Sequence, residues 1–325
     1  MINAAEFKSF YDRELLPSLQ NLEGDRKKLI NGSYKYIAIG LIPFAISVVL
    51  AGGNVLDASW IALAVGIVLS AIVFFFLNYK KIGEIQSRFK SEVIAKMVKA
   101  IDPSLSYQAN GKISDYDYHK SKLYLSQINK YKGDDLVTGT VGKTAIRFSE
   151  LLTQMEKETT DSKGNKSKSV TTIFKGLFFV GDFNKKFIGE TIVLPDTAEN
   201  LFGSLGTMLQ KWNVQRDQLV KMEDPEFEKA FAVYGTDQVE ARYILSTSLM
   251  QRILQFKQKT RSNMSMSFIA NEVFIGVPLR ENLFEAPFFS SMVKYERIES
   301  FNKYLVLFIG IVEDLNLNTR IWTKE

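Results

Sequence analysis

The side chains that could take part in chemistry are few and scattered. The chain of 325 residues has no cysteine and a single histidine, His119. The missing thiols exclude thiolate nucleophiles, zinc sites with thiolate ligands and iron–sulfur clusters held by cysteine, and one histidine cannot build a multi-histidine metal site. His119 lies beside Lys120 in a tyrosine-rich polar stretch, where we expect an exposed or hydrogen-bonded ring. We therefore predict no catalytic residues, no cofactor and no metal site.

An acidic group in the second half of the chain comes nearest to a metal or acid–base site. Carboxylates supply the oxygen ligands that magnesium and calcium prefer. The same residues suit the start of a helix, because Asp224 can cap a helix that begins at Pro225, and glutamates favour the positive end of the helix dipole. We favour this capping interpretation over a metal site or catalysis. The group consists of Glu223, Asp224, Glu226 and Glu228.

A second polar cluster follows within twenty residues. Asp237, with Glu240 three positions later, matches an acidic version of the capping box. Arg242 and Tyr243 could recognise a carboxylate or phosphate group of a partner. An internal ion pair of Arg242 with Glu240 or Asp237 is the favoured interpretation. The candidate partner-binding residues are Asp224, Asp237, Arg242 and Tyr243.

The tripeptide Gly142-Lys143-Thr144 invites comparison with a phosphate-binding loop. That loop requires a glycine five positions before Gly142, where this chain has Val137. The segment also leads into strand-like sequence, whereas a phosphate-binding loop leads into a helix whose N-terminus holds the anion. We therefore predict a turn.

Two apolar segments dominate the first quarter of the chain and must position everything that follows. Residues 36–51 are almost entirely apolar, and residues 58–77 contain no charged residue. Since about 20 apolar residues in a helix span the hydrocarbon core of a bilayer, we predict transmembrane helices over about 34–53 and 58–78. The connector, residues 52–57, permits only a tight helical hairpin.

Basic residues flank this predicted hairpin on the side of both termini. Lysines and arginines precede the first span and follow the second, whereas the connector carries only the charged residue Asp57. The positive-inside rule then predicts both termini in the cytoplasm and a multi-pass protein of the bacterial inner membrane. After the second span, Lys80, Lys81 and Arg88 are candidates for contact with lipid headgroups. Because the basic residues gather beside the apolar segments, we predict the lipid bilayer as a partner and no nucleic acid.

The remaining sequence mixes helix and strand signals. Periodic apolar positions predict a helix over residues 5–30 and a helical stalk over 80–101, and we expect these two to pack together. A β-rich segment spans 135–194, with a polar hairpin tip at 156–169. Another helix is predicted over 201–212.

The last hundred residues predict helices, one hairpin and a closing helix. The helices begin after Asp224, Asp237 and Ser246, and the hairpin turns at Asn271-Glu272. The closing helix runs from Tyr295 to Leu315, and its apolar centre is too short to cross a bilayer.

The predicted fold class is α+β: a two-helix transmembrane hairpin with a helical stalk, plus a cytoplasmic mixed α+β domain containing an antiparallel sheet. The hairpin and stalk come from the apolar segments and the helix period, and the domain from the alternating strand patterns. The predicted segments are an N-terminal cytoplasmic helix, the hairpin, the stalk and the α+β domain, over residues 1–33, 34–79, 80–101 and 102–325.

The stretch from Asp224 to Tyr234, continuing from Asp237 to Leu245, resembles the bacterial membrane-protein family catalogued as domain of unknown function 3137. The order of an N-terminal helix, a two-span hairpin, a β-rich region and this motif also matches that family. The resemblance implies no activity and transfers no catalytic residue. It places the chain beside LemA-type membrane proteins, so a protein of that type is a candidate partner.

These observations favour a membrane-anchored cytoplasmic scaffold or interaction module without evident catalysis. Small residues in the hairpin and the amphipathic stalk indicate self-association into a homo-oligomer. One alternative is an enzyme whose acidic and arginine residues converge only in the fold. Another is a subunit of a membrane-remodelling or transport complex.

Overall fold

The computed structural model describes residues 4–32, 36, 42, 56–160, 164, 166–183, 187–196 and 219–317. Two compact units make up the chain. The helical unit contains Ile2–Lys96 and Glu285–Glu299, and the sheet unit contains Met97–Phe284 and Ser300–Glu325. Most of the first predicted span (34–53) and the whole helix predicted over 201–212 lie outside the described residues.

The helical unit is built on two long helical segments. The first comprises α1 (Ala4–Phe10), the π-helical turn η1 (Tyr11–Leu15) and α2 (Leu16–Gly32). The second comprises α4 (Leu56–Phe89), the π-helical turn η2 (Lys90–Ile94) and α5 (Ala95–Ile101), whose last residues belong to the sheet unit.

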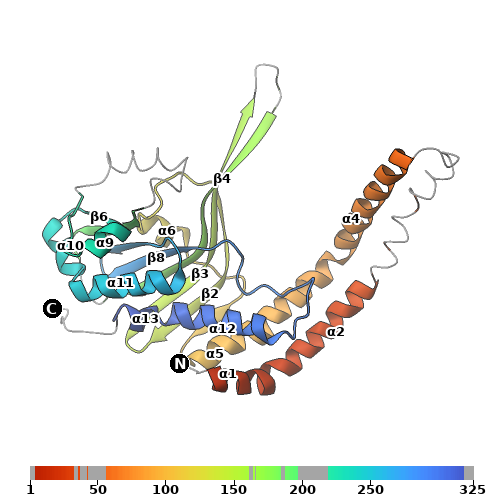
Figure 1. The fold of residues 1–325 in the computed structure, drawn as a ribbon, viewed down its shortest axis with the longest axis horizontal. Helices are drawn as coiled ribbons and strands as arrows, with labels where there is room; N and C mark the ends of the chain where they lie inside the picture. The colour runs from red at the N-terminus through yellow and green to blue at the C-terminus, as the bar shows by residue number, and fades with distance from the viewer. Residues whose placement is uncertain are drawn as a thin grey trace. The chain divides into compact units, whose positions relative to one another are not determined.

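The N-terminal helix and the stalk pack together, as the sequence predicts. Figure 1 shows α2 and the second half of α4 side by side, and Arg88 donates to Asp25 across them at 2.8 Å. The N-terminal segment buries the apolar stripe that the helix period predicts, because this stripe faces the stalk. Its fully buried members include Phe7, Leu15, Leu19 and Leu22.

The sheet unit contains one antiparallel sheet in the order β1-β2-β3-β4-β8-β7-β5-β6. This confirms the α+β class and the antiparallel sheet. Hairpins join β2 to β3, β3 to β4 and β7 to β8, because only a few residues separate the two strands of each pair. The strands are β1 Ser106–Gln108, β2 Lys130–Val141, β3 Thr144–Thr160, β4 Lys166–Asp182, β5 Glu190–Pro195, β6 Phe231–Gly235, β7 Ser265–Ile269 and β8 Glu272–Pro278.

The β3–β4 hairpin extends well beyond the other strands as a long arm (Figure 1). Its pairing continues outward to Thr160 and Lys166, and the side chains near the tip are exposed. This agrees with the polar hairpin tip predicted over 156–169. At the other end, the pair Val141 and Thr144 closes the turn that contains Gly142, so the prediction of a turn instead of a phosphate-binding loop is confirmed.

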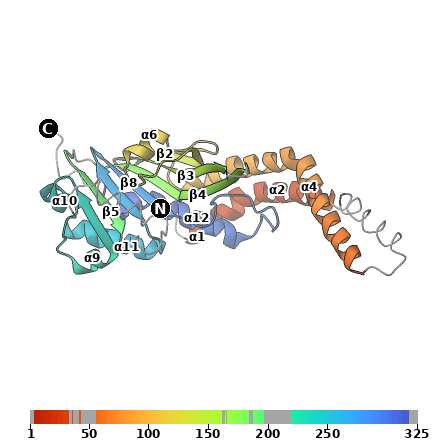
Figure 2. The same ribbon diagram turned by 90° about the horizontal axis from the view of Figure 1, so that it is seen from above.

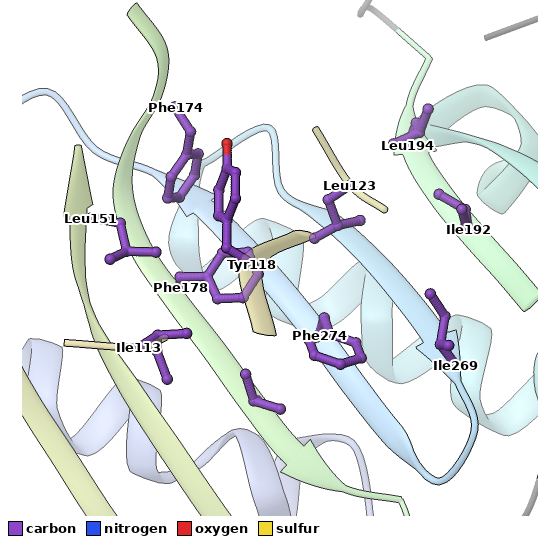
Figure 3. Packing of buried hydrophobic residues seen from close by; sticks show 11 residues of the cluster. Ile113, Tyr118, Leu123, Leu151, Phe174, Phe178, Ile192, Leu194, Ile269 and Phe274 are labelled. Carbon is purple, nitrogen blue, oxygen red and sulfur yellow. The ribbon is translucent and has the colours of Figure 1, made fainter. Parts of the chain in front are cut away.

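The central strands are buried on both faces. On one face, Tyr118 and Phe178 pack with ring centroids 5.5 Å apart, in the cluster shown in Figure 3. On the other face, Phe148 contacts both Phe179 and Phe308, at 6.4 and 6.2 Å. Burial of both faces explains why β4 reads as a nearly continuous apolar run after its exposed outer half.

Short helices cover the sheet or connect its strands, and Figure 2 shows them from a second direction. The closing helix predicted from Tyr295 to Leu315 is divided at Gly310 into two helices. The helices are α6 Asp115–Lys120, α9 Pro225–Ala230, α10 Gln238–Ile244, α11 Thr247–Thr260, α12 Tyr295–Ile309 and α13 Ile311–Asp314.

The segment from Asp224 to Leu245 contributes one strand to the sheet, between two helices. Its helix α9 ends at Ala230, and the next five residues form β6, which pairs with β5. The spacing of four between Phe227 and Phe231 is that of one helix face, and it predicts that both face the core from one helix. Both are buried and their rings are 5.1 Å apart, but Phe231 reaches the core as the first residue of a strand.

Candidate functional site

One helix in the described part of the chain, Leu63–Ile101, is long and apolar enough to cross a membrane. Within its most apolar stretch only 17% of the residues are buried inside the structure. A soluble protein would pack such a helix into its core, so the exposure is the unusual feature. The large exposed side chains are Val65, Ile67, Val68, Leu69, Ile72, Phe75, Phe76 and Leu77.

Four residues of α4 at a spacing of four form a buried stripe: Gly66, Ser70, Phe74 and Asn78. The two polar members bond to their own helix, with Ser70 Oγ donating to the carbonyl of Ile67 at 2.8 Å and Asn78 Nδ2 to that of Phe74 at 2.9 Å. These bonds satisfy their polar atoms without a partner outside the helix.

The predicted headgroup residues follow the apolar part of α4 but differ in their surroundings. Lys80 and Lys81 are exposed. Arg88 instead pairs with Asp25 and Glu92, at 2.8 and 2.9 Å. The hydrogen bond from Arg88 lowers the pKa of Asp25 below its ordinary value. The structure therefore leaves the two lysines as the better candidates for contact with anionic lipid.

The predicted helix caps are confirmed. Asp224 accepts hydrogen bonds from the amides of Glu226 and Phe227, at 2.9 and 3.1 Å. Asp237 accepts from the amides of Val239 and Glu240, at 2.8 and 3.1 Å. Each carboxylate thus satisfies the first amides of its own helix, α9 or α10, and this role accounts for both aspartates without a metal or a substrate.

Glu240 has a role that the capping-box prediction missed. Its carboxylate accepts from the amides of Ile188 and Gly189, at 3.0 and 2.6 Å, and so ties α10 to the entry of β5. Gly189 permits this approach, because an added Cβ would lie 2.5 Å from Thr236 Oγ1 and 2.8 Å from a carboxylate oxygen of Glu240.

Arg242 does not form the internal ion pair that we favoured. Its Nε donates to the carbonyl of Lys221 at 3.2 Å, and its Nη2 lies 3.5 Å from Gln238 Oε1. The guanidinium therefore binds backbone and amide oxygens, because Asp237 and Glu240 are already engaged by backbone amides. The structure does not bring Arg242 and the two capping aspartates together as a reactive group.

Apolar side chains are exposed on the outer face of α10. Val239 is 76% exposed and Tyr243, four residues later on the same side of the helix, is 50% exposed. Ile188, whose amide binds Glu240, is 99% exposed. We call these three residues the α10 surface. Tyr243 was predicted from the sequence as a partner-binding residue, but its two apolar neighbours were not, since exposure is not visible from residue type.

A network of charges that was not predicted from the sequence joins α6 to the sheet. Arg147 pairs with Asp117 and Glu272, at 3.1 and 2.8 Å, and Lys120 also pairs with Glu272, at 2.5 Å. Burial lowers the pKa of Arg147, but its two carboxylate partners outweigh this and raise the pKa above the ordinary value. Since the charges satisfy one another, the network serves as a structural clamp.

Two tyrosines, the buried Tyr118 of α6 and the half-buried Tyr131 of β2, also have structural roles. Tyr118 shares a hydrogen bond of 2.9 Å with Thr153, and Tyr131 donates to the carbonyl of Ile113 at 2.9 Å. Burial raises the pKa of both hydroxyls above the ordinary value. Exposed His119 lies 3.3 Å from Asp115, in agreement with the ring that we expected.

Comparison with known proteins identifies a family over part of the chain. The model of DUF3137, a protein family of unknown function, matches residues 172–317 and confirms the predicted resemblance. No curated protein matches the sequence. The crystal structure of the mycobacterial trehalose monomycolate transport factor A, TtfA, is similar at 9% identity and a TM-score of 0.34, covering 68% of this chain and 96% of that one. A likeness at this level carries no argument about function.

Proposed function

We propose that this chain, which carries a DUF3137 domain over residues 172–317, is a membrane-anchored interaction module with its sheet unit in the cytoplasm. The exposed apolar side chains of α4 carry the proposal. Burying one large apolar side chain in lipid is favourable by about 1.5–3 kcal/mol, so a row of them gives a strong anchor. Exposure of the same side chains to water gives no comparable gain in free energy.

The anchor that we propose is a hairpin of two spans. Its support is the buried stripe of α4, which requires a partner on one side of the helix only. Tyr36, from the start of the first predicted span, lies with its ring 5.8 Å from that of Phe74 in this stripe. A second helix that packs along Gly66 and Ser70 would approach closely, because these side chains are small.

The proposed orientation has both termini in the cytoplasm. Lys80 and Lys81 are exposed just beyond the last apolar turn of α4, where the positive-inside rule places basic residues on the cytoplasmic side. The connector carries no basic residue. This orientation puts the sheet unit in the bacterial cytoplasm, beneath the inner membrane.

Extraction of isolated membranes with alkaline carbonate tests the anchor. We expect the full chain to stay in the membrane pellet. A variant with Ile67→Lys, Leu69→Lys and Ile72→Lys, which disrupts the second span, should be released more readily than the wild type, because each lysine near the centre of a span costs about 2.5–3.5 kcal/mol. A wild-type chain released by carbonate would contradict the anchor.

We further propose that the module self-associates through the α10 surface, with a second copy of the chain as the occupant. The support is that Ile188, Val239 and Tyr243 are all exposed. Small residues of the hairpin were the other predicted basis for self-association, but two of them, Gly66 and Ser70, are buried within the chain. Arg242, exposed beside them, adds a donor of the kind enriched at interfaces. The enzyme and transport-subunit alternatives have no comparable support among the described residues.

Mass measurement after mild-detergent extraction tests this surface. We expect a homo-oligomer for the wild type and a smaller species for Val239→Arg. Val170→Arg is the matched control, since Val170 is 50% exposed on the β3–β4 arm. Equal masses for wild type and Val239→Arg would contradict the assignment. A different co-purifying membrane protein, such as one of the LemA type, lost only with Val239→Arg would replace the second copy as the occupant.

A further inference from the structure

We infer that Phe288 and Phe289 form an aromatic wedge that inserts into the headgroup boundary of the cytoplasmic leaflet, beside the end of α4. The inference rests on the proposed anchor and adds a membrane contact that is no part of either span. It comes from a segment about two hundred residues after α4 in the sequence, which joins the helical unit as residues Glu285–Glu299.

Polar contacts fix the backbone on both sides of the wedge. Before it, Glu285 pairs with Lys90 at 2.9 Å, and the amide of Ala286 donates to Gln86 Oε1 at 3.0 Å. Both helical partners lie near the end of α4. The backbone just before the wedge is therefore held against the stalk.

The far side of the wedge is held by the N-terminal helical segment. Arg26 donates to the carbonyl of Phe288 at 3.0 Å and pairs with Glu23 at 2.7 Å. Glu23 in turn accepts from the amide of Met292 at 3.0 Å. Since Glu23 and Arg26 are both buried, these bonds are protected from competing water.

This backbone directs the two rings toward the apolar part of α4. Phe288 lies 6.4 Å from Phe74 and Phe289 lies 6.3 Å from Phe75, between ring centroids. Phe289 is nevertheless 83% exposed, and Phe76 is 74% exposed. A ring held rigidly with most of its surface open to solvent is poorly explained by packing within the chain.

The surroundings match the chemistry of an anionic bilayer surface. Phe75 lies two residues inside the end of the apolar run, and Lys80 lies about 7.5 Å further along the helix at 1.5 Å per residue. Tyr79 is 61% exposed between them. Apolar rings, then an exposed tyrosine, then Lys80 and Lys81 reproduce the order of acyl chain, interface and phosphate.

Nitroxide labels on single cysteines test the inference, and the chain has no native cysteine to remove. The full chain is placed in nanodiscs of phosphatidylcholine and phosphatidylglycerol, and the collision of each label with oxygen and with a water-soluble nickel complex is measured. A label at Phe289→Cys reports the surroundings of the wedge itself. A label at Ser290→Cys reports the surroundings next to it, with the Phe289 ring still present. Leu69→Cys is the reference inside the span, and Ser167→Cys is the reference in water.

The inference predicts that the labels at 289 and 290 favour oxygen over nickel, as the label at 69 does. If the labels at 289 and 290 behave like the water reference at 167 while the label at 69 lies in lipid, the wedge is contradicted and the anchor is not. Nickel access at 69 would instead overturn the anchor and the wedge together. Low access of both reagents at 289 and 290 would overturn the lipid contact in favour of contact with protein.

Discussion

Four charged side chains between Asp224 and Arg242 bind mainly backbone groups. Asp224 and Asp237 accept the first amides of α9 and α10, Glu240 holds the entry of β5, and Arg242 binds the carbonyl of Lys221. Each charge therefore organises local structure. A carboxylate that accepts two amides is poorly available to a substrate, and the two aspartates therefore act as helix caps.

Removal of the Asp224 cap should destabilise α9 and the strand β6 that follows it. For Asp224→Ala we expect a loss of about 0.5–2 kcal/mol in the free energy of local opening, because two amides lose their acceptor. Native-state hydrogen exchange of β6 amides in the full chain measures this loss. Asp224→Asn is the matched control and should retain most of the stability, since asparagine caps equally well. An equal loss in both variants would mean that the carboxylate charge, not the cap, matters.

The contact of Glu23 with residues 288–292 should depend on pH. The hydrogen bond from Arg26 lowers the pKa of Glu23 below its ordinary value of 4.5, with the amide of Met292 acting in the same direction. A lowered folded-state pKa means that the stabilisation is present above pH 4.5 and is lost as the pH falls through the folded-state value. The protection of the Met292 amide, measured as its exchange rate relative to an unstructured peptide at the same pH, should therefore fall below pH 4.5 in the wild type. In Glu23→Gln the protection should lack this dependence, and an identical pH profile in both would contradict the assignment.

Contacts between residues close together in the chain were predictable from the sequence, and contacts between residues far apart in the chain were not. The caps of Asp224 and Asp237 follow from residues two or three positions away, so the spacing alone predicts them. Glu240 binds amides about fifty positions earlier, and Arg242 a carbonyl twenty-one positions earlier. Such partners are set by the pairing of β5 with β6, which the sequence analysis did not foresee.

At the scale of elements, the sequence pattern predicted some strands of the sheet correctly and missed others. Alternating sequences predicted the β2–β3 and β7–β8 hairpins correctly, since their strands are neighbours in the chain. The strand β6 was missed, because Phe227 and Phe231 at a spacing of four fit a helix as well. Its pairing with β5 decides the outcome, and that pairing bridges more than thirty residues.

Gly176 in β4 should be intolerant of any side chain. Its φ is +153°, and an added Cβ would lie 2.1 Å from the carbonyl oxygen of Val277 in the neighbouring strand β8. We expect Gly176→Ala to destabilise the β4–β8 pairing by about 1–3 kcal/mol or more, as backbone strain of this kind does. Hydrogen exchange of β4 amides would measure the loss.

Gly24 in α2 provides the matched control for this substitution. An added Cβ there meets no atom within 4 Å. Gly24→Ala should therefore stabilise α2 by about 0.4–1 kcal/mol, through the smaller entropy of the unfolded chain. A loss of β4 protection no larger than the experimental error in Gly176→Ala would contradict the close approach of the two strands.

At the scale of the whole molecule, each of the two units has its own proposed role: the helical unit anchors the chain and the sheet unit binds a partner. The helical unit exposes apolar side chains along α4, and the sheet unit exposes the α10 surface. The sequence predicted the apolar helix from length and composition alone. It did not predict that residues 285–299 belong to the helical unit, because that assignment depends on contacts between segments far apart in the chain.

The topology of the anchor is tested most directly by labelling single cysteines in intact cells with a membrane-impermeant maleimide. We predict that Asn54→Cys, in the connector, is labelled from outside, whereas Ser9→Cys and Ser167→Cys are labelled only after the inner membrane is permeabilised. This result would place both units on the cytoplasmic side of a two-span hairpin. Labelling of Ser167→Cys in intact cells, or protection of Asn54→Cys until permeabilisation, would contradict the account.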